Sequence, residues 1–283
     1  MNLTPLAGIE DVVMSERDFD RVASIIHADA GIALTSAKKS LVYSRLAKRV
    51  RALGLSTFSA YCDFVETPEG EDERGVFLSA LTTNVTYFFR EPHHFDDLRE
   101  NILPGLVRKA EAGGRVRLWS AGCSTGQEPY CLALTTLSVA PNIGKFDFKI
   151  LATDIDPEVL ATAERGVYDD SLIANISAHD QSMYFQSADH SQVAVKPNVR
   201  SLISFRRMNL IEPWPVKGPF DVIFCRNVVI YFDQETQEMV WSRFAKLLDP
   251  QGKIYVGHSE RVSGSARALL KPDGVTAYRK QPV

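Results

Sequence analysis

One stretch of the sequence indicates how the rest of the chain folds: Val116-Arg-Leu-Trp-Ser-Ala-Gly-Cys-Ser-Thr-Gly-Gln-Glu-Pro-Tyr130. It starts as an apolar, β-rich strand, turns through Gly122 and Gly126, and then favours a helix with Pro129 in its first turn. Glycine lets the backbone turn tightly and approach a ligand closely, as in nucleotide sites at the carboxyl end of a first strand. Two glycines also occur in plain strand-to-helix connections, so the run alone leaves both interpretations open.

A second β-rich run ends in Ala152-Thr-Asp-Ile-Asp156. An acidic side chain at the end of the second strand accepts hydrogen bonds from ribose hydroxyls in nucleotide-binding sheets, which gives Asp154 a cofactor role. Aspartate is also common at helix N-caps, and Pro157 begins a predicted helix. Capping is therefore the alternative role for Asp154.

Glu128 indicates which class of nucleotide cofactor the predicted site would bind. Dinucleotide sites place a pyrophosphate at the helix N-terminus, where an acidic side chain would repel it. A ligand with an ammonium group and a sulfonium, such as S-adenosylmethionine, is favoured over NAD. A carboxylate that only complements the helix dipole is the alternative.

Outside this run, the pattern after Pro104 alternates β-rich and helical segments, which predicts a parallel sheet with crossover helices. A predicted helix from Pro157 to Arg165 ends at Gly166. Val193-Ala-Val195 and Val199–Ile203 then predict short antiparallel strands, hence a small β-subdomain inserted in the sheet domain. The predicted strands of the main sheet are Val116–Ser120, Lys149–Thr153, Ser204–Met208, Val222–Cys225 and Lys253–Val256.

The first ninety residues predict helices. Ser15 is an N-cap candidate, and Phe19, Val22, Ala23 and Ile26 follow at helical spacing. The other predicted helices run from Ala37 to Leu53, from Thr57 to Val65 and from Arg74 to Leu81, and Glu66 to Glu73 are predicted to form a solvated acidic loop.

Composition limits the functional classes. With 283 residues and 45% apolar composition, the chain can bury one large core and a smaller one, so two domains are expected. A formal charge of −3 provides no general attraction for nucleic acid, and no nucleic-acid partner is expected.

No metal site or disulfide is expected. His93 and His94 are adjacent, so they should project differently along a helix, and no third ligand is near in the sequence. The four cysteines form no CxxC pair and should be reduced thiols: Cys62, Cys123, Cys131 and Cys225.

The first thirty residues contain no basic start followed by an apolar run, and no stretch is apolar enough to cross a bilayer. We therefore expect a cytoplasmic protein without membrane insertion. Nothing in the sequence indicates an obligate dimer, so a monomer is expected.

Four blocks in order carry a family resemblance: Leu81-Thr-Thr-Asn-Val-Thr-Tyr-Phe-Phe-Arg-Glu-Pro-His-His-Phe95, Trp119–Tyr130, Ala152–Asp156 and Phe224-Cys-Arg-Asn-Val-Val-Ile-Tyr-Phe-Asp233. With them, the chain resembles the chemotaxis receptor methyltransferases, the CheR family, over most of its length. The resemblance implies methyl esterification of glutamate side chains on the cytoplasmic helical bundle of chemoreceptors, at membrane receptor arrays. The cofactor would be S-adenosylmethionine and the product S-adenosylhomocysteine.

The same resemblance implies an α/β fold in three parts. A helical N-terminal domain would span residues 1–81, and a linker over residues 82–103 would contribute to the cofactor site. A doubly wound, Rossmann-like methyltransferase domain would span residues 104–283, with the antiparallel β-subdomain over about residues 167–202.

The resemblance also implies site residues. Arg90 and Tyr231 would lie nearest the transferred methyl group as the catalytic pair. Asn84, Thr86 and Arg90 would face the cofactor from the linker, Ala121 and Gly122 from the glycine turn, Glu128 at the ammonium group, Asp154 at the ribose, Asn209 and Leu210 at the adenine, and Asn227 and Val228 at the sulfur.

Each of these residues has an ordinary alternative. Arg90 could pair with Glu91 at the surface, and Asn84 could cap a helix C-terminus. The aromatic run Tyr87 to Phe89 is expected to anchor the linker in the core. A glutamate substrate is already ionised at neutral pH, with a reference pKa of about 4.3, so no base or nucleophilic triad is required.

A basic flank is predicted on the helix from Ala37 to Leu53, in a stretch that lacks acidic residues from Ala30 to Cys62. At about 100° per residue, its members fall within a sector of about 100° beside an apolar stripe. The flank comprises Lys38, Arg45, Lys48 and Arg49, and the stripe comprises Val42, Leu46, Val50 and Leu53. The resemblance makes this flank the contact for a chemoreceptor; a solvated surface and a nucleic-acid surface are the alternatives.

One stretch departs from some relatives, which grip a pentapeptide at the receptor tail with a glycine-containing loop of the β-subdomain. Gln186-Ser-Ala-Asp-His-Ser-Gln-Val-Ala-Val195 contains no glycine. We therefore predict activity independent of that pentapeptide. The alternatives are a methyltransferase of the same fold acting on another protein or nucleic acid, or a non-catalytic S-adenosylmethionine sensor.

Overall fold

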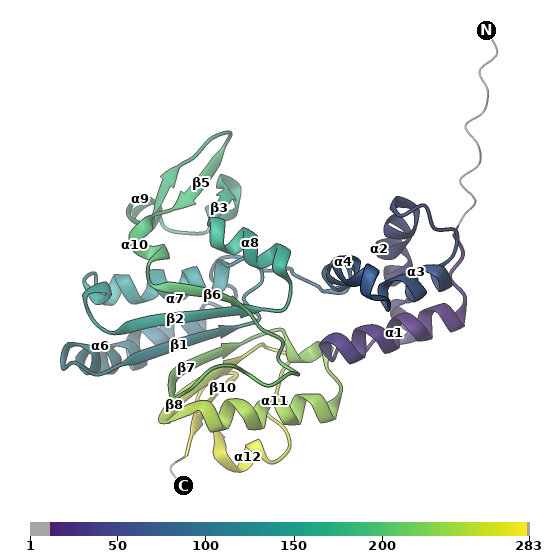
Figure 1. Cartoon of the computed structure of the whole chain (residues 1–283). Coiled ribbons are helices and arrows are strands. Elements are labelled where there is room, and N and C mark those ends of the chain that lie inside the picture. The colour runs from purple at the N-terminus through teal and green to yellow at the C-terminus, as the bar shows by residue number, and fades with distance from the viewer. Residues whose placement is uncertain (1–11, 282–283) are drawn as a thin grey trace. The chain divides into compact units, whose positions relative to one another are not determined.

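The computed structural model describes residues 12–281 (Figure 1). The chain forms two compact units, Met1–Thr83 and Asn84–Val283. Residues 84–103, expected as a linker, group with the second unit.

The first unit is helical, as predicted. Ser15 caps its first helix through a reciprocal pair of hydrogen bonds with Asp18, and Gly31, at φ 70°, ends that helix. The elements are α1 (Glu16–Ala30), η1 (Ser36–Lys38), α2 (Lys39–Ala52), α3 (Phe58–Val65), η2 (Pro68–Gly70) and α4 (Glu71–Leu81).

The predicted acidic loop is wrong at its end. Helix α4 begins at Glu71, and Glu73 is buried. Glu73 accepts hydrogen bonds from Tyr61 at 2.9 Å and from Arg49 at 2.6 Å. A carboxylate with such partners is stable inside a small helical core, whereas the sequence shows only a run of acids.

The second unit is an α/β unit. Its helical elements are α5 (His93–Asp97), η3 (Leu98–Ile102), α6 (Leu103–Glu111), α7 (Gln127–Val139), η4 (Ile143–Lys145), α8 (Pro157–Arg165), η5 (Asp170–Ile173), α9 (Ala178–Tyr184), α10 (Pro197–Arg200), η6 (Val229–Tyr231), α11 (Gln234–Leu247) and α12 (Ala266–Leu269). Its strands are β1 (Val116–Ala121), β2 (Phe148–Asp154), β3 (Val167–Asp169), β4 (Phe185–Ser187), β5 (Gln192–Val195), β6 (Ile203–Arg207), β7 (Phe220–Cys225), β8 (Leu248–Val256), β9 (Leu270–Pro272) and β10 (Ala277–Lys280).

Seven strands form the main sheet in the order β6-β2-β1-β7-β8-β10-β9. The first five are parallel, and β10 runs antiparallel to β8 and β9. The order reverses between β1 and β7, which is the doubly wound arrangement predicted from the sequence. Each face of the sheet has its own core, one that includes α7 residues and one that includes α11 residues.

A second, antiparallel sheet has the order β3-β5-β4, which confirms the inserted β-subdomain. The prediction of a strand over Val199–Ile203 is wrong, because Pro197–Arg200 form the short helix α10 and Ile203 starts β6 of the main sheet. Proline favours a first helical turn, and a short apolar run does not distinguish helix from strand.

Candidate active site

The candidate site lies at the carboxyl ends of β1 and β7, where the strand order reverses. In open α/β sheets, ligands bind in the crevice at this point. Ala121 ends β1 and is buried, and the chain continues into Gly122. Asn227 and Val228 follow β7, the strand beside β1.

Gly122 is required by its conformation and by its neighbour. Its φ is 79°, a left-handed value that favours glycine. A Cβ built on Gly122 would overlap Cγ2 of Val228. The turn is fixed on its other side by the Gly122 amide, which donates to the Thr153 carbonyl at 2.8 Å. The loops after β1 and β7 therefore touch at this glycine.

Asp154, at the end of β2, is a buried carboxylate. It accepts hydrogen bonds from the backbone amides of Ser124 at 2.8 Å and Asp156 at 3.1 Å. Burial raises the pKa of Asp154 to about 6, and these amide donors oppose the rise. The capping alternative does not apply to Asp154, because Asp156 caps α8 by accepting from the Glu158 amide at 2.9 Å.

Asn84 joins the start of the second unit to this turn. Its Nδ2 donates to Asp156 at 2.8 Å, and its carbonyl accepts from the Ser124 hydroxyl at 2.8 Å. Asn84 does not cap α4, whose C-cap is Thr82. Thr86, two residues further on, is half-buried.

Glu128 lies in the first turn of α7, as expected. Its carboxylate accepts from the Ser120 hydroxyl at 2.7 Å and pairs with Arg226 at 3.1 Å. Burial raises the pKa of Glu128, and the Arg226 charge opposes the rise. The carboxylate thus already faces one cation.

Arg226 is a central residue that the sequence analysis did not select. Its side chain is 2% exposed, and besides Glu128 it pairs with Glu91 at 3.5 Å and donates to the Arg90 carbonyl. The guanidinium lies 5.6 Å from the centre of the Phe95 ring. An arginine directly after a fully buried strand is the one local signal that could have indicated it.

Arg90 lies between two residues with left-handed backbones, Phe89 at φ 56° and Glu91 at φ 57°. Its guanidinium donates to the Val85 carbonyl at 3.1 Å and lies 5.9 Å from the Tyr87 ring centre. Strained non-glycine conformations of this kind concentrate at functional sites. Glu91 pairs with Arg226 and His258 and not with Arg90, so the alternative of an Arg90–Glu91 surface pair is wrong.

The aromatic run beside Arg90 only partly anchors the core. Phe88 is buried and packs edge-on against Tyr168, and Phe89 packs against the same core from a half-buried position. Tyr87 is 53% exposed, so the expectation that it is a core anchor is wrong.

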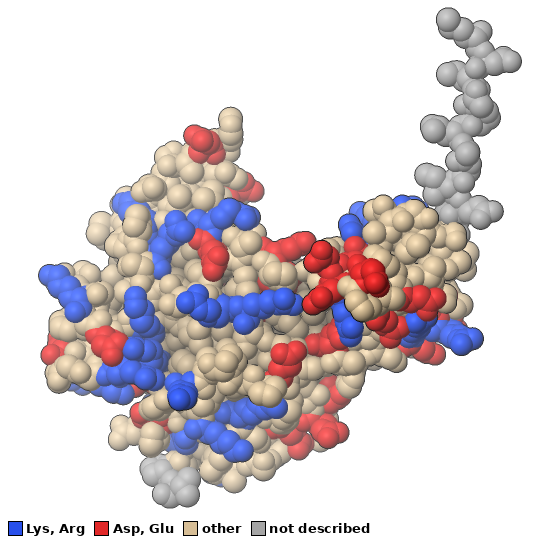
Figure 2. All heavy atoms as spheres, in the orientation of Figure 1, with Lys and Arg blue, Asp and Glu red and all other residues tan. Residues whose placement is uncertain are grey.

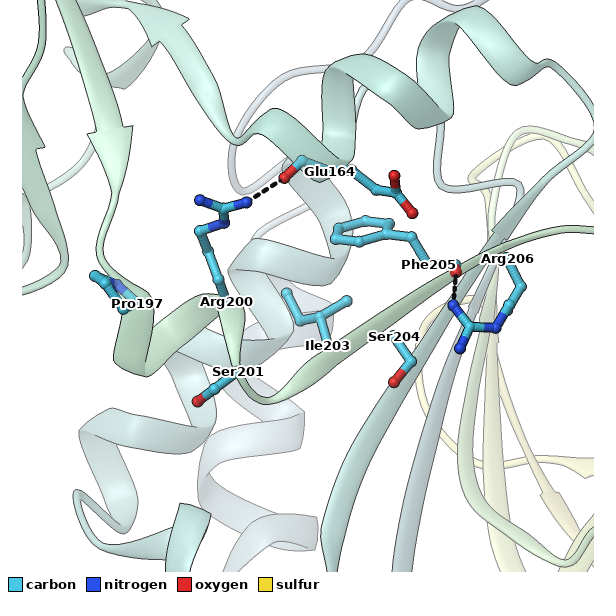
Figure 3. A pocket seen from close by; sticks show the side chains of 8 residues that line it. All are labelled: Glu164, Pro197, Arg200, Ser201, Ile203, Ser204, Phe205 and Arg206. Carbon is cyan, nitrogen blue, oxygen red and sulfur yellow. Dashed lines mark hydrogen bonds between the residues drawn. The ribbon is translucent and has the colours of Figure 1, made fainter.

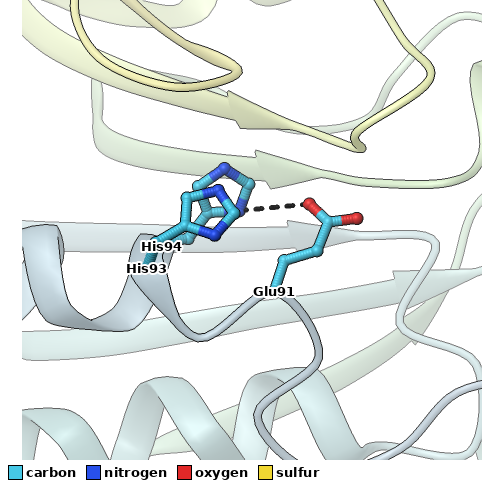
Figure 4. A group of neighbouring side chains, drawn as sticks. All are labelled: Glu91, His93 and His94. Atoms are coloured by element: carbon cyan, nitrogen blue, oxygen red, sulfur yellow. Dashed lines mark ion pairs between the residues drawn. The ribbon is translucent and has the colours of Figure 1, made fainter.

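The expectation of divergent histidines with no third ligand near is also wrong. His93 and His94 have ring centroids 4.2 Å apart, and Glu91 brings a ligand atom within 4.8 Å of both (Figure 4). However, Arg226 already supplies positive charge to Glu91, and the buried His94 Nε2 bonds to Thr276 at 2.8 Å. This geometry disfavours a second cation, and the absence of a metal site stays a prediction.

Glu260 holds the loop after β7 and was also missed. Its buried carboxylate accepts hydrogen bonds at 2.9 Å from the amides of Asn227, Val228 and Val229. It also accepts from Gly257 at 2.6 Å. This carboxylate stabilises Asn227 at a left-handed φ of 60°. Nothing in the local sequence links the two segments.

The remaining candidates lie on segments that continue from β6 and from the β7 loop. Leu210 is buried, and its carbonyl accepts from Trp214 at 3.1 Å. Asn209 accepts from the Ile211 amide at 3.2 Å. Tyr231 lies half-buried in η6, and its amide is 3.3 Å from the Val228 carbonyl.

The predicted basic flank of α2 is only partly a free surface. Arg45 donates to three carbonyls at the end of α4, including that of Thr82 at 2.8 Å, and Arg49 pairs with Glu73. Lys48 is exposed, and Lys38 is half-buried. In the apolar stripe, Val42, Leu46 and Val50 are buried as predicted, whereas Leu53 is 37% exposed.

Comparison with known proteins identifies the family. Residues 84–277 match the family described as CheR methyltransferase, SAM binding domain, and residues 17–82 match the CheR methyltransferase, all-alpha domain. The chain belongs to the CheR family.

Curated CheR relatives match along nearly their whole length. A probable chemotaxis protein methyltransferase of Rhizobium etli is 52% identical, covering 90% of this chain and 96% of the relative. The chemotaxis protein methyltransferase of Salmonella typhimurium is 41% identical, covering 95% and 92%. Chemotaxis protein methyltransferase 2 of Pseudomonas aeruginosa is 38% identical, covering 97% of each chain.

The CheR family is one of chemotaxis methyltransferases, and the cofactor is S-adenosylmethionine. The site suits this ligand, because Asp154 offers a buried carboxylate at the end of β2 and Glu128 offers a largely buried one in the first turn of α7. Among residues 12–281, no helix is long and apolar enough to cross a bilayer.

Proposed function

We propose that the protein methylates glutamate side chains on the cytoplasmic helical bundle of chemoreceptors, with S-adenosylmethionine as methyl donor. The observation that carries the proposal is a pair of carboxylates beside the strained Arg90 segment: Asp154, buried at the end of β2, and Glu128, whose side chain in the first turn of α7 is 12% exposed. They suit a cofactor with an ammonium group and a ribose.

In this proposal, Asp154 accepts from the ribose hydroxyls and Glu128 holds the ammonium group. Burial raises the pKa of both carboxyls, because it makes the ionised form less favourable. A hydrogen-bond donor or a cation of the bound cofactor would offset this cost. The other proposed cofactor contacts are Asn84, Thr86, Arg90, Ala121, Gly122, Asn209, Leu210, Asn227 and Val228.

The chemistry requires little of the protein. The bound cofactor supplies a methyl group on a positively charged sulfur. The substrate carboxylate, ionised at neutral pH, needs no base, so the site must hold it in line and exclude water. We assign orientation of the carboxylate to Arg90, whose planar guanidinium suits a carboxylate, and one neutral hydrogen bond to Tyr231. No proton moves in the transfer.

The helix α2 is the proposed receptor contact. Lys38 and Lys48 would face acidic side chains of the bundle, and charge attraction across an interface chiefly increases the rate of encounter. Arg45 and Arg49 would act through α2 itself, since Arg45 donates to carbonyls at the end of α4 and Arg49 donates to Glu73.

Independence from the receptor pentapeptide is part of the proposal. The turn between β4 and β5 has left-handed backbones at His190 and Ser191, with φ values of 53° and 58°, at positions where glycine is usual. A turn with these side chains supports the absence of the glycine-dependent grip. Micromolar or tighter binding of a receptor pentapeptide would contradict this part.

The test is an incubation with methyl-labelled S-adenosylmethionine and a receptor cytoplasmic fragment that lacks the pentapeptide. We expect label on the fragment that alkali releases, as for a glutamate ester, and its loss in Arg90→Ala. Arg108→Ala, at an exposed position of α6, is the matched control and should retain full activity.

Two outcomes would contradict the proposed function in different ways. A folded protein that binds S-adenosylhomocysteine in a calorimeter yet labels no receptor fragment would overturn receptor methylation. Label that resists alkali would indicate another acceptor group.

A further inference from the structure

The strand β6 is an edge of the main sheet: it pairs with β2, and no strand within residues 12–281 pairs with its other side. The Leu202 carbonyl accepts from the Ile150 amide, and the Met208 amide donates to the Asp154 carbonyl, both at 2.9 Å. Backbone groups alternate along a strand, so those of Ile203, Phe205 and Arg207 point away from β2. The outer edge of β6 therefore offers hydrogen-bonding groups to a further strand.

Two cavities flank this edge and both include Ser204. One, of about 520 Å³, is lined by Ile203 and Phe205 together with residues of α8 and α10 (Figure 3). The other, of about 320 Å³, is lined by Leu151 and Phe220 and lies on the opposite face of the sheet. Ile203 and Phe205 belong to one core of the sheet, whereas Phe220 and Leu151 pack in the other, which places the cavities on opposite faces.

Basic side chains lie along the edge and beside the starts of the neighbouring strands β2, β1 and β7. Figure 2 shows Lys and Arg gathered over β6 and over the starts of β1 and β2. Among the described residues, six of them form no ion pair with a carboxylate; those that donate hydrogen bonds do so to backbone carbonyls, and Arg200 also bonds to the Tyr130 hydroxyl. The six, here called the basic rim, are Arg115, Lys149, Arg200, Arg206, Arg207 and Lys217.

The acidic groups of the same surface do not neutralise the rim. Asp147 pairs with Arg117, at 2.5 Å, outside the set of six. Glu164 lines the larger cavity and accepts from Arg200 only through its backbone carbonyl, at 2.6 Å. A cation-rich edge repels a second copy of itself, so the charge disfavours self-association and is complementary to an acidic chain.

We propose that the edge of β6 binds an extended, acidic segment of a partner protein, which adds a strand beside β6. Main-chain hydrogen bonds to the outward amides of Phe205 and Arg207 and to the Arg207 carbonyl would hold the segment; the Phe205 carbonyl already accepts from the Arg206 guanidinium at 2.6 Å. Its alternate side chains would enter the two cavities, and its carboxylates would face the basic rim. The surface contains none of the proposed cofactor contacts, so this docking function is separate from methyl transfer.

The test uses the full chain and a fluorescent eight-residue peptide of alternating Glu and Val, followed by anisotropy. We expect binding that weakens as salt rises from about 0.05 M to about 0.3 M. A peptide of alternating Glu and Pro carries the same charge but lacks half of the amide donors, so it should not bind. Absence of Glu-Val binding up to millimolar peptide, or equal binding of the Glu-Pro peptide, would overturn strand addition.

Variants locate the site. Arg206→Glu and Lys149→Glu should each weaken binding about fivefold, since each reverses an exposed charge. Lys271→Glu makes the same change at β9, the other edge of the same sheet, and should have no effect. Equal weakening by Lys271→Glu would overturn the assignment to β6.

A backbone test separates strand addition from charge. Arg207→Ala and Arg207→Pro remove the same cation, but only the proline variant also loses the outward backbone N–H. The Arg207→Pro protein should therefore bind the Glu-Val peptide far more weakly than the Arg207→Ala protein does. The melting temperatures of the two variants should agree. If the two bind alike, the strand model fails. If duplex DNA or phosphatidylglycerol vesicles bind more tightly than the Glu-Val peptide and lose affinity in Arg206→Glu, the acidic-peptide proposal is wrong.

Discussion

Asp154 is a residue at which burial and function oppose each other. Burial raises its pKa from 3.8 to about 6, so folding favours the protonated carboxyl and the ionised form costs stability above about pH 6. The amides of Ser124 and Asp156 compensate in part. Ribose hydroxyls would complete the set of donors around the ionised group.

This opposition predicts a pH-dependent affinity. S-adenosylhomocysteine should bind fully above about pH 6 and more weakly as pH falls below it, by at most about tenfold per pH unit for one carboxyl. Calorimetry from about pH 5 to about pH 8 measures this trend. In Asp154→Asn the affinity should be lower and the part of the slope due to this carboxyl should vanish. An unchanged slope in that variant would assign the titration to another group.

Gly122 yields a second prediction at the residue scale. Gly122→Ala should destabilise the fold by at least about 1–2 kcal/mol, because φ is positive and the new methyl meets Val228, and it should weaken cofactor binding. Gly105→Ala, in α6 with open space around it, is the control and should stabilise by about 0.5–1 kcal/mol. Urea unfolding and calorimetry measure both. Adding Val228→Ala should relieve only the overlap.

Residue patterns could predict some of the site but not all of it. Gly122, Glu128 and Asp154 stand in local contexts with a physical meaning, namely a turn, a helix start and a strand end. Arg226 has only its place after a fully buried strand, and Glu260 has no such context, because the roles of both depend on partners far away in the chain.

At the scale of elements, the loop after β7 depends on one side chain from the segment after β8. The Glu260 carboxylate satisfies amides that the short η6 turn leaves unpaired. The loop it fixes carries Asn227 and Val228 and leads to Tyr231. Its conformation is therefore determined by tertiary contact.

Glu260→Gln should lower the free energy of unfolding by about 2–3 kcal/mol, because it removes the charge and turns one acceptor oxygen into a donor facing other donors. It should also weaken S-adenosylhomocysteine binding. The control is Glu235→Gln on exposed α11 sequence, which should change stability by less than about 0.5 kcal/mol. Wild-type stability and affinity in Glu260→Gln would show that the loop after β7 keeps its conformation without this carboxylate.

The prediction of helices and strands succeeded where the apolar pattern of the sequence was clear, and it failed where an element was too short to show such a pattern. The strands β1, β2 and β7 are apolar runs with helices between them, and their existence followed from that alternation. The four residues of α10 are too few to show any period, so a strand was predicted there.

At the scale of the molecule, the chain divides into a helical unit and a sheet unit, with the proposed receptor contact in the first and the proposed cofactor contacts in the second. A substitution in the helical unit should therefore change receptor binding without changing cofactor binding, and a substitution in the sheet unit should do the reverse. Kinetics can therefore assign each unit its role.

Lys48→Glu should raise KM for the receptor fragment about fivefold and leave kcat and S-adenosylhomocysteine affinity unchanged, since an exposed charge acts mainly on encounter. Lys246→Glu, exposed on α11, should leave all three unchanged. In the wild type, KM should rise with salt between about 0.05 M and about 0.3 M. An unaltered KM in Lys48→Glu would remove α2 from the receptor contact.

The dependence of the β7 loop on Glu260 has a consequence for biosynthesis. Ribosomes release a chain from its N-terminus, so β1, β2, β6 and β7 all emerge before Glu260 does. A nascent chain can thus pair its central strands while the loop beside Gly122 still lacks the carboxylate that shapes it. We expect a chain arrested before residue 260 to bind S-adenosylhomocysteine more weakly than the 283-residue chain does, because the loop that carries Asn227 and Val228 lacks its acceptor.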